Sequence, residues 1–271
     1  MRCHLNTWIF LCAVLCVLIG IESGWGLAVK PALLDLQIRP GQHQTGIITV
    51  GNPANSENRF RASVVHFRLN RNGQMQQAEP DSFAVQDWIK FNPREFTLAP
   101  NEQQQIRYTL IVPQDADVGD YWGALEFMPL TTETVTSHDS THQTNVKLVV
   151  SSAIVVPIFV QIGDVDYKWS IMEMQAHEVG DNAEVAITLS NVGNGRVPFR
   201  TELDVVDSSG AVVAHQERGE ISLFPFSERV VSLKVTDPIP IGMYTVRARV
   251  ASDKANDMLA GETRFQKLEH P

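Results

Sequence analysis

The chain has 271 residues, is 44% hydrophobic and 20% charged, and carries a formal net charge of −9. This composition is sufficient to bury a core and argues against disorder for most of the chain. The acidic balance makes nucleic acid a poor partner.

The first 26 residues read as an export signal. A basic start at Arg2 precedes the apolar run Trp8 to Ile21, and the small-residue stretch ESGWGLA follows. The run is too short to span a bilayer comfortably. We therefore expect a cleaved signal peptide, with cleavage after Gly26 or Ala28, and an uncleaved anchor is the alternative.

All three cysteines, Cys3, Cys12 and Cys16, lie inside this segment. The exported chain would have none, so we expect it to be stabilised by core burial without disulfides. No later hydrophobic segment is long enough to be an anchor, so we expect no membrane span in the mature chain.

The remainder predicts short β-strands separated by Asn, Gly, Pro and Asp. Examples are TGIITVGN, FRASVVHFRLN, QQIRYTLIV, VAITLSN and ERVVSLKV. Helical periodicity is nearly absent, and the strand signals have the spacing of a sandwich. The sequence therefore predicts an all-β fold.

The strand pattern occurs twice. In each half, two prolines thirteen residues apart bracket one strand: Pro100 and Pro113, then Pro225 and Pro238. Each half then places a Tyr just after a Gly at a strand start, which is typical of a tyrosine corner: Tyr121 and Tyr244. We predict two immunoglobulin-like β-sandwich domains in tandem, residues 27–162 and 163–271, after a signal peptide of residues 1–26.

The most apolar segment of the mature chain is VKLVVSSAIVVPIFVQI, residues 146–162. Ser151, Ser152 and Pro157 argue against a membrane span, and the many Val and Ile residues favour one β-strand. Alternate residues from Val146 to Ile162 form one face that fits a core and is apolar except at Ser152, whereas the other face is half apolar. Pro157 cannot donate to a ladder, which predicts a sheet edge or a bulge there.

The polar segment TTETVTSHDSTHQTN precedes this strand and is predicted to be a mobile loop. An apolar edge strand after a long loop is a liability unless the edge is used. One use is β-augmentation, in which a partner adds a strand. The alternative is that the other domain or the N-terminal strand covers the edge.

Catalytic motifs are missing from the sequence. His138 and His142 could share a metal on a helix, but their Ser/Thr-rich surroundings favour a loop. Asp115, Asp117 and Asp120 are better explained as turn formers than as calcium ligands. The sequence predicts neither an enzyme nor a metal or cofactor site.

Residues 28–162 resemble the N-terminal domain of periplasmic pilus-assembly chaperones, which have the PapD-like fold. The resemblance is carried by WIKFNPREFTLAPNEQQQIRYTLIVP, then GDYWGALEFMP, a polar loop and AIVVPIFV. Family positions are occupied by Trp88, Pro93, Phe96, Leu98, Pro100, Arg107, Tyr121 and Trp122. The ending PIFV is closest to a divergent branch of such chaperones.

This resemblance implies a periplasmic chaperone that acts without ATP. Its partners would be pilus or surface-fibre subunits and an outer-membrane usher, and the last strand of the first domain would be donated to a subunit. The residues implied for client binding are Val150, Ile154, Val156, Ile158 and Phe159.

The chain departs from the family at the basic pair that anchors the terminal carboxylate of a subunit. Its first strand reads VKPALLDLQ and its donor strand VSSAIVVP, with no basic residue in register. Lys30, Arg39 and Lys147 are the candidate substitutes. The alternative functions are a structural or adhesive surface protein with no client, and a carbohydrate-binding module, for which Trp88 and Trp122 lie far from Trp169.

Overall fold

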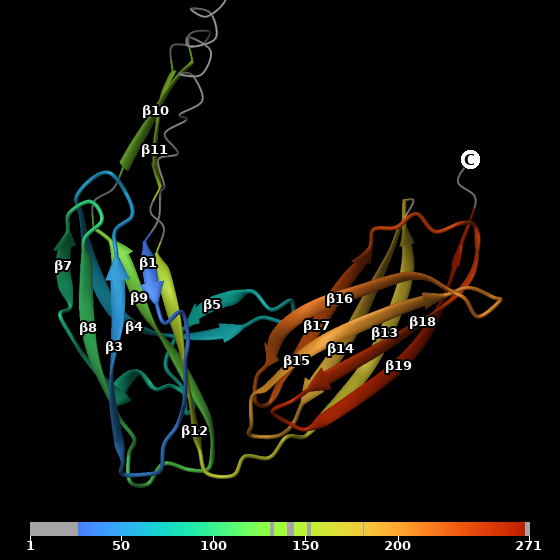
Figure 1. The fold of residues 1–271 in the computed structure, drawn as a ribbon, viewed down its shortest axis with the longest axis horizontal. Coiled ribbons are helices and arrows are strands. Elements are labelled where there is room, and N and C mark those ends of the chain that lie inside the picture. The colour runs from blue at the N-terminus through green and yellow to red at the C-terminus, as the bar shows by residue number, and fades with distance from the viewer. Residues whose placement is uncertain (1–26, 131–132, 140–143, 151–152, 181, 269–271) are drawn as a thin grey trace, which may run out of the picture.

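The computed structural model describes residues 27–130, 133–139, 144–150, 153–180 and 182–268 (Figure 1). The predicted signal peptide and its cysteines lie outside this part of the chain. Almost all of the regular structure described is β-strand, and the one short 3-10 helix there is η1 (Gln86–Trp88). The predicted all-β class is confirmed.

The first sandwich consists of two sheets. The first sheet has the order β1-β3-β8-β6, and its strands are β1 (Ala28–Lys30), β3 (His43–Gly51), β8 (Gln103–Ile111) and β6 (Ile89–Asn92). The second has the order β2-β12-β9-β4-β5, with β7 paired to β4. Its strands are β2 (Leu34–Gln37), β12 (Ile154–Ile162), β9 (Gly119–Pro129), β4 (Asn58–Leu69), β5 (Met75–Ala78) and β7 (Glu95–Leu98).

The second sandwich also has two sheets. One has the order β13-β14-β17 and the other β16-β15-β18-β19. The strands are β13 (Trp169–Val179), β14 (Asn182–Asn191), β15 (Val197–Val206), β16 (Val212–Leu223), β17 (Ser227–Val235), β18 (Gly242–Ser252) and β19 (Asp257–Lys267). Figure 1 shows the two sandwiches as the arms of a V.

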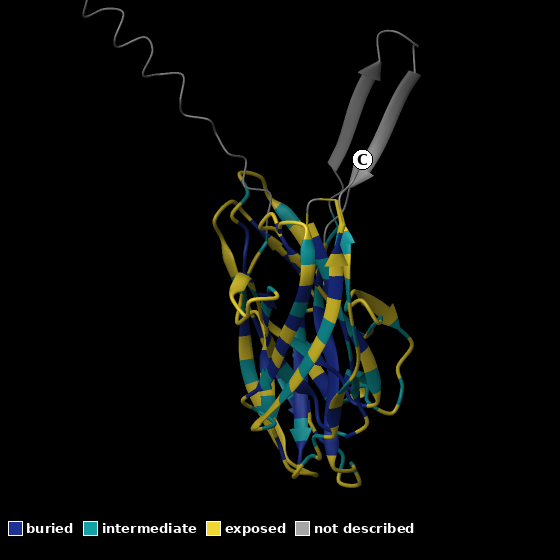
Figure 2. Ribbon diagram, turned by 90° about the vertical axis from the view of Figure 1, so that its right-hand side faces the viewer, coloured by how far each residue is buried: buried dark blue, intermediate teal, exposed yellow. Residues whose placement is uncertain are grey.

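Each sandwich encloses its own apolar core, built by alternating residues of facing sheets. β14, for example, alternates buried and half-buried residues, which places Val185, Ile187 and Leu189 inside. Figure 2, in which the second sandwich faces the viewer, shows this alternation as buried and exposed bands along the strands. Interior apolar residues of this kind are the main source of folding free energy.

Both predicted tyrosine corners are confirmed. The Tyr121 hydroxyl donates to the Asp117 carbonyl oxygen at 3.0 Å, and the Tyr244 hydroxyl donates to the Pro240 carbonyl oxygen at 2.6 Å. Each bond reaches back to the turn before its strand. The prolines bracket β8 in the first half and β17 in the second, as the repeat predicted.

The prediction of one strand over residues 146–162 is wrong. The run is divided between β11 (Thr144–Val150) and β12, which starts at Ile154. β11 pairs with β10 (Glu133–Asp139) in a separate two-stranded sheet that rises above the first sandwich in Figure 1. The polar segment predicted to be a loop therefore contains β10, because pairing with β11 outweighs its polar composition.

Candidate functional site

The first residues of β12 are paired on one side only. β9 pairs with β12 along its whole length, from Ile154 to Ile162. β2 lies on the other side and pairs in parallel only from Ile158 to Gln161. Among the described residues, no strand pairs with Ile154–Pro157 on that side, and we call these four residues the open edge. The prediction that Pro157 lies at a sheet edge is confirmed.

The open edge exists because the N-terminal part of the chain changes sheets. β1 pairs with β3 in the first sheet, whereas β2 pairs with β12 in the second. The connection between them, residues 31–33, is not a strand. The N-terminal strands therefore leave the upper part of β12 uncovered.

The main-chain groups of the open edge follow from the strand alternation. The Ile38 amide donates to the Gln161 carbonyl oxygen at 3.1 Å, so Gln161 turns its main chain toward β2. Successive residues turn theirs to opposite sides, and β12 has no register shift against β9. Val155 and Pro157 therefore face the open side. The Pro157 carbonyl oxygen faces the start of β2, where Ile158 pairs with Leu34, and Pro157 has no N–H. The edge therefore offers one N–H and one carbonyl oxygen, both of Val155.

The even-numbered side chains of β12 face the core of the first sandwich. Val156 is 1% exposed and Ile158 is 0% exposed, and both belong to the main apolar cluster. This burial argues against the predicted donation of these two side chains, because a client could reach them only by unpacking the core. Ile154, at the top of the strand, is half-buried.

The odd-numbered side chains of β12 face the second sandwich. Phe159 is buried and packs in a cluster with Phe67, Trp122, Ala124 and, from the second sandwich, Phe224. Val155 is half-buried and packs against this cluster. This contact explains why the second face of the strand is more apolar than a solvated face requires.

The other predicted site residues lie apart from one another. Val150 ends β11, and its side chain, like that of Lys147, lies outside the described part of the chain. Lys30 is exposed on β1, in the opposite sheet, and Arg39 is exposed after the end of β2. The structure does not bring Lys30 and Arg39 together on one element, and their anchoring role stays a prediction.

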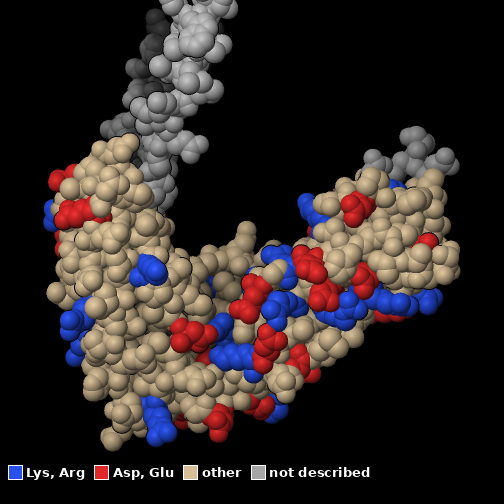
Figure 3. Space-filling model, in the orientation of Figure 1, with Lys and Arg blue, Asp and Glu red and all other residues tan. Residues whose placement is uncertain are grey.

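An apolar interface joins the two sandwiches. The Trp122 ring meets the Phe224 ring edge-on at 4.8 Å and stacks on Phe83 at 5.1 Å. Its indole N–H donates to the Phe67 carbonyl oxygen at 2.7 Å, so no polar group of this side chain is left unsatisfied. The space-filling view shows a mostly uncharged hollow between the arms, with charged side chains gathered on the second sandwich (Figure 3).

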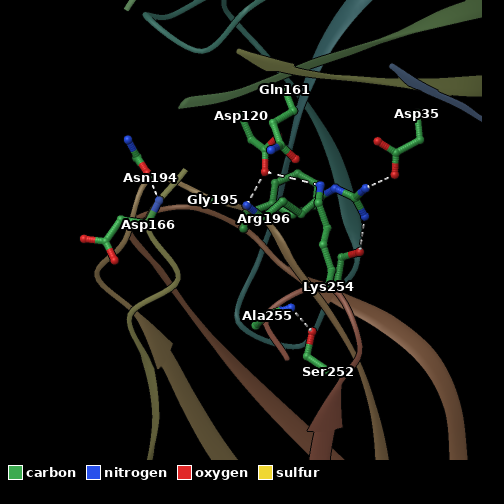
Figure 4. A network of polar contacts seen from close by, with 12 residues as sticks. Asp35, Asp120, Gln161, Asp166, Asn194, Gly195, Arg196, Ser252, Lys254 and Ala255 are labelled. Atoms are coloured by element: carbon green, nitrogen blue, oxygen red, sulfur yellow. Dashed lines mark hydrogen bonds and ion pairs between the residues drawn. The ribbon is translucent and has the colours of Figure 1, made fainter. Parts of the chain in front are cut away.

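A polar network lies beside this interface (Figure 4). Arg196, just before β15, is 4% exposed. Its guanidinium lies 3.9 Å from the centre of the Phe159 ring, donates to Asp35 Oδ2 at 2.5 Å and donates to Ser222 Oγ at 2.9 Å. One side chain of the second sandwich thus contacts both β2 and β12.

Asp120 is the acidic centre of the network. It is 1% exposed, accepts from the Arg196 amide at 2.5 Å, and lies 3.7 Å from Lys254 Nζ. The Asp120 amide donates to the Asn194 carbonyl oxygen at 2.9 Å, and Asn194 Nδ2 donates to the Val118 carbonyl oxygen. These bonds fix the start of β9 against a turn of the second sandwich.

Burial raises the pKa of Asp120 above its ordinary value of 3.8, and Lys254 and Arg196 oppose that shift only in part. Burial likewise raises the pKa of Tyr167, in the linker, to about 12. Both shifts have the same cause, which is that the joint between the sandwiches holds polar groups away from water.

The shift at Asp120 predicts a pH dependence of folding stability. A raised pKa in the folded state stabilises the fold below pH 3.8, and this contribution is lost as the pH rises through the raised pKa. Asp120→Asn cannot ionise, so we expect its unfolding free energy to lack this decline. Urea midpoints between acid and neutral pH would measure it. Asp237→Asn, at an exposed position, is the control and should follow wild type; a parallel profile for Asp120→Asn would contradict the prediction.

Sequence reasoning missed Arg196 and Asp120 as partners. A single Arg between a turn and a strand has no distinguishing pattern, and QDADVGD reads as a turn whether or not its last Asp is buried. Only the packing of the two sandwiches brings them together. The signal that was available was the half-apolar face of β12, which required a cover.

The described residues contain no group of three or more His, Cys, Asp or Glu side chains arranged to hold a metal ion. His138 belongs to β10, and His142 lies outside the described part. The structure has no helix, among the residues described, that is long and apolar enough to cross a membrane.

No family model and no curated protein matches the chain. Among solved structures it is similar to the class 5 fimbriae chaperone CfaA, at 9% identity and a TM-score of 0.42 over 90% of this chain and 100% of that one. It is similar to the CupB2 chaperone of Pseudomonas aeruginosa, at 12% identity and a TM-score of 0.40 over 84% and 95%. It is also similar to the E. coli chaperone DraB, at 14% identity and a TM-score of 0.38 over 90% of this chain and 98% of that one. Likeness at this level assigns no function, which has to be argued from the chain's own residues.

Proposed function

We propose that this protein is an exported, ATP-independent chaperone for pilus or surface-fibre subunits, which binds a client strand at the open edge. The observation that carries the proposal is the unpaired side of Ile154–Pro157, in a strand that is paired on both sides further along. Exported proteins rarely leave such an edge free, because it invites aggregation. An edge that is kept open is suited to strand addition.

The pairing of β11 supports the same proposal. β11 pairs with β10 on one side, and no second partner strand is found among the described residues. Its sequence carries Val146, Leu148 and Val150 at alternate positions, just upstream of the open edge. We propose Val150 and Ile154 as the apolar client contacts, with the main chain of Val155 supplying the ladder.

The motifs of residues 28–162 supply the client class, and with it periplasmic action and an outer-membrane usher as a further partner. Lys30, Arg39 and Lys147 stay the proposed anchors for a client carboxylate. Client binding by this route needs no catalytic group and no cofactor, since the free energy comes from main-chain hydrogen bonds and apolar contacts.

Val155→Pro tests this role, because it removes the one N–H that the open edge offers. The pairs with β9 should persist, since Val155 turns its main chain away from β9. We expect the unfolding free energy to fall by no more than about 1 kcal/mol. Co-purification of a subunit encoded beside the gene should fall by roughly tenfold or more, which corresponds to 1.4 kcal/mol of binding free energy.

The matched control is Val155→Thr, which keeps the N–H and the β-branched shape. It should bind the subunit nearly as well as wild type. Equal binding by Val155→Pro would show that clients do not pair with this edge. A wild-type chain that co-purifies with no neighbouring subunit would instead favour a structural or adhesive protein.

A further inference from the structure

Arg196 contacts the two strands that define the open edge. Its guanidinium covers the Phe159 ring on β12 at 3.9 Å and binds Asp35 on β2 at 2.5 Å. Asp35 and Phe159 are register partners in the parallel pair. A residue of the second sandwich therefore holds β2 to β12 within one residue of the point where their pairing begins.

β2 depends on this contact more than most strands would. It is four residues long and lies at the end of its sheet, and among the described strands it pairs with β12 alone. The strand just before β2 belongs to the other sheet. Few main-chain bonds fix its register, and short edge strands open readily.

The position of Arg196 is itself fixed from several sides. Its amide donates to Asp120 Oδ2 at 2.5 Å, and its guanidinium donates to Ser222 Oγ at 2.9 Å. A buried guanidinium whose partner is removed is strongly unfavourable, so Arg196 keeps Asp35, and with it β2, in one place. Arginine suits this task because its planar group can stack on a ring and bind a carboxylate at once.

We propose that Arg196 is a positioning residue that fixes where β2 begins on β12 and so sets the length of the open edge. Client binding by the first sandwich then depends on the second sandwich, although the second supplies no strand to the client. This inference rests on the proposed function and adds to it the part played by the second sandwich.

Hydrogen exchange tests the positioning without any client. In Arg196→Ala, we expect the Ile38 amide, which donates to Gln161, to exchange roughly tenfold faster, with Arg196→Lys in between. Arg200→Ala is the matched control, because Arg200 lies in the same sandwich and forms an exposed ion pair with Asp253. It should leave Ile38 unchanged. Unchanged protection in Arg196→Ala would overturn the proposal.

Client pairing is measured on the same full-length variants with a short synthetic peptide of alternating Val and Thr, by fluorescence anisotropy. We expect roughly tenfold weaker binding for Arg196→Ala and near wild-type binding for Arg200→Ala. If wild type binds the peptide and Arg196→Ala binds equally well, this inference fails and the proposed function stands. If wild type binds no peptide, the proposed function fails and the inference fails with it.

A second variant keeps the test valid if Arg196→Ala does not fold. Asp35 is 44% exposed in its side chain, so Asp35→Ala removes the same contact from the β2 side with less burial at risk. It should also speed hydrogen exchange at the Ile38 amide and weaken binding of the peptide. Wild-type exchange and binding in Asp35→Ala would contradict the positioning role.

Discussion

Ile158→Ala is expected to destabilise the first sandwich by about 2–5 kcal/mol, although Ile158 lies in the strand that carries the open edge. Its side chain is 0% exposed and belongs to the apolar cluster between the two sheets. Truncation would leave a cavity that the surrounding strands can fill only in part. Urea denaturation of the full-length chain measures the loss.

Val155→Ala is the control for this prediction. Val155 is half-buried, on the opposite face of the same strand. Its truncation to Ala should lower the unfolding free energy by about 1 kcal/mol. A stable Ile158→Ala variant that no longer binds a subunit would show that the side chain is given to the client. Destabilisation by Ile158→Ala would instead place this side chain in the core. Client binding would then fall to the main chain of the open edge and to the side chains of Ile154 and Val150.

Local signals in the sequence were sufficient for the sandwiches themselves. The proline pairs and the two Gly-then-Tyr strand starts predicted β8, β17 and both tyrosine corners, because turns and corners depend on neighbouring residues. The alternation of Val156, Ile158 and Val160 likewise predicted which face of β12 meets the core. The alternation of side chains between the two faces of a strand does not depend on what packs beyond it.

The candidate site was harder to predict because it depends on contacts between distant segments. Ser151, Ser152 and Ala153 separate β11 from β12 with no Gly or Pro between them, so the run of Val and Ile reads as one strand. The cover over the second face of β12 comes from Phe224 and Arg196, in the other sandwich. Their own surroundings do not reveal that they face Phe159.

The second large effect is expected at Gly193, where the linker between the sandwiches lies against a turn. A Cβ built on Gly193 would lie 2.7 Å from the Lys168 amide nitrogen and nearer still to the Asp166 carbonyl oxygen. Both are main-chain atoms, so no side-chain rotation relieves the clash. The turn is also bonded to the linker, through the Val192 amide to the Lys168 carbonyl oxygen at 2.8 Å and the Gly195 amide to the Asp166 carbonyl oxygen at 3.2 Å.

We expect Gly193→Ala to lower the unfolding free energy by about 3 kcal/mol, because one of these backbone bonds must break or the linker must move. The damage should begin at the joint, so the Asp120 amide, which donates to Asn194, should lose protection from hydrogen exchange before the two cores do.

Gly219→Ala provides the comparison. Gly219 lies in β16 with no atom within 4 Å of a Cβ built there, so the change should alter stability by no more than about 1 kcal/mol. If Gly193→Ala proves as stable as Gly219→Ala, the linker is free of the turn, and the joint that places Arg196 over β12 is not fixed. A large loss of unfolding free energy in Gly193→Ala, but not in Gly219→Ala, would mean that the linker fixes the angle between the sandwiches before any client binds.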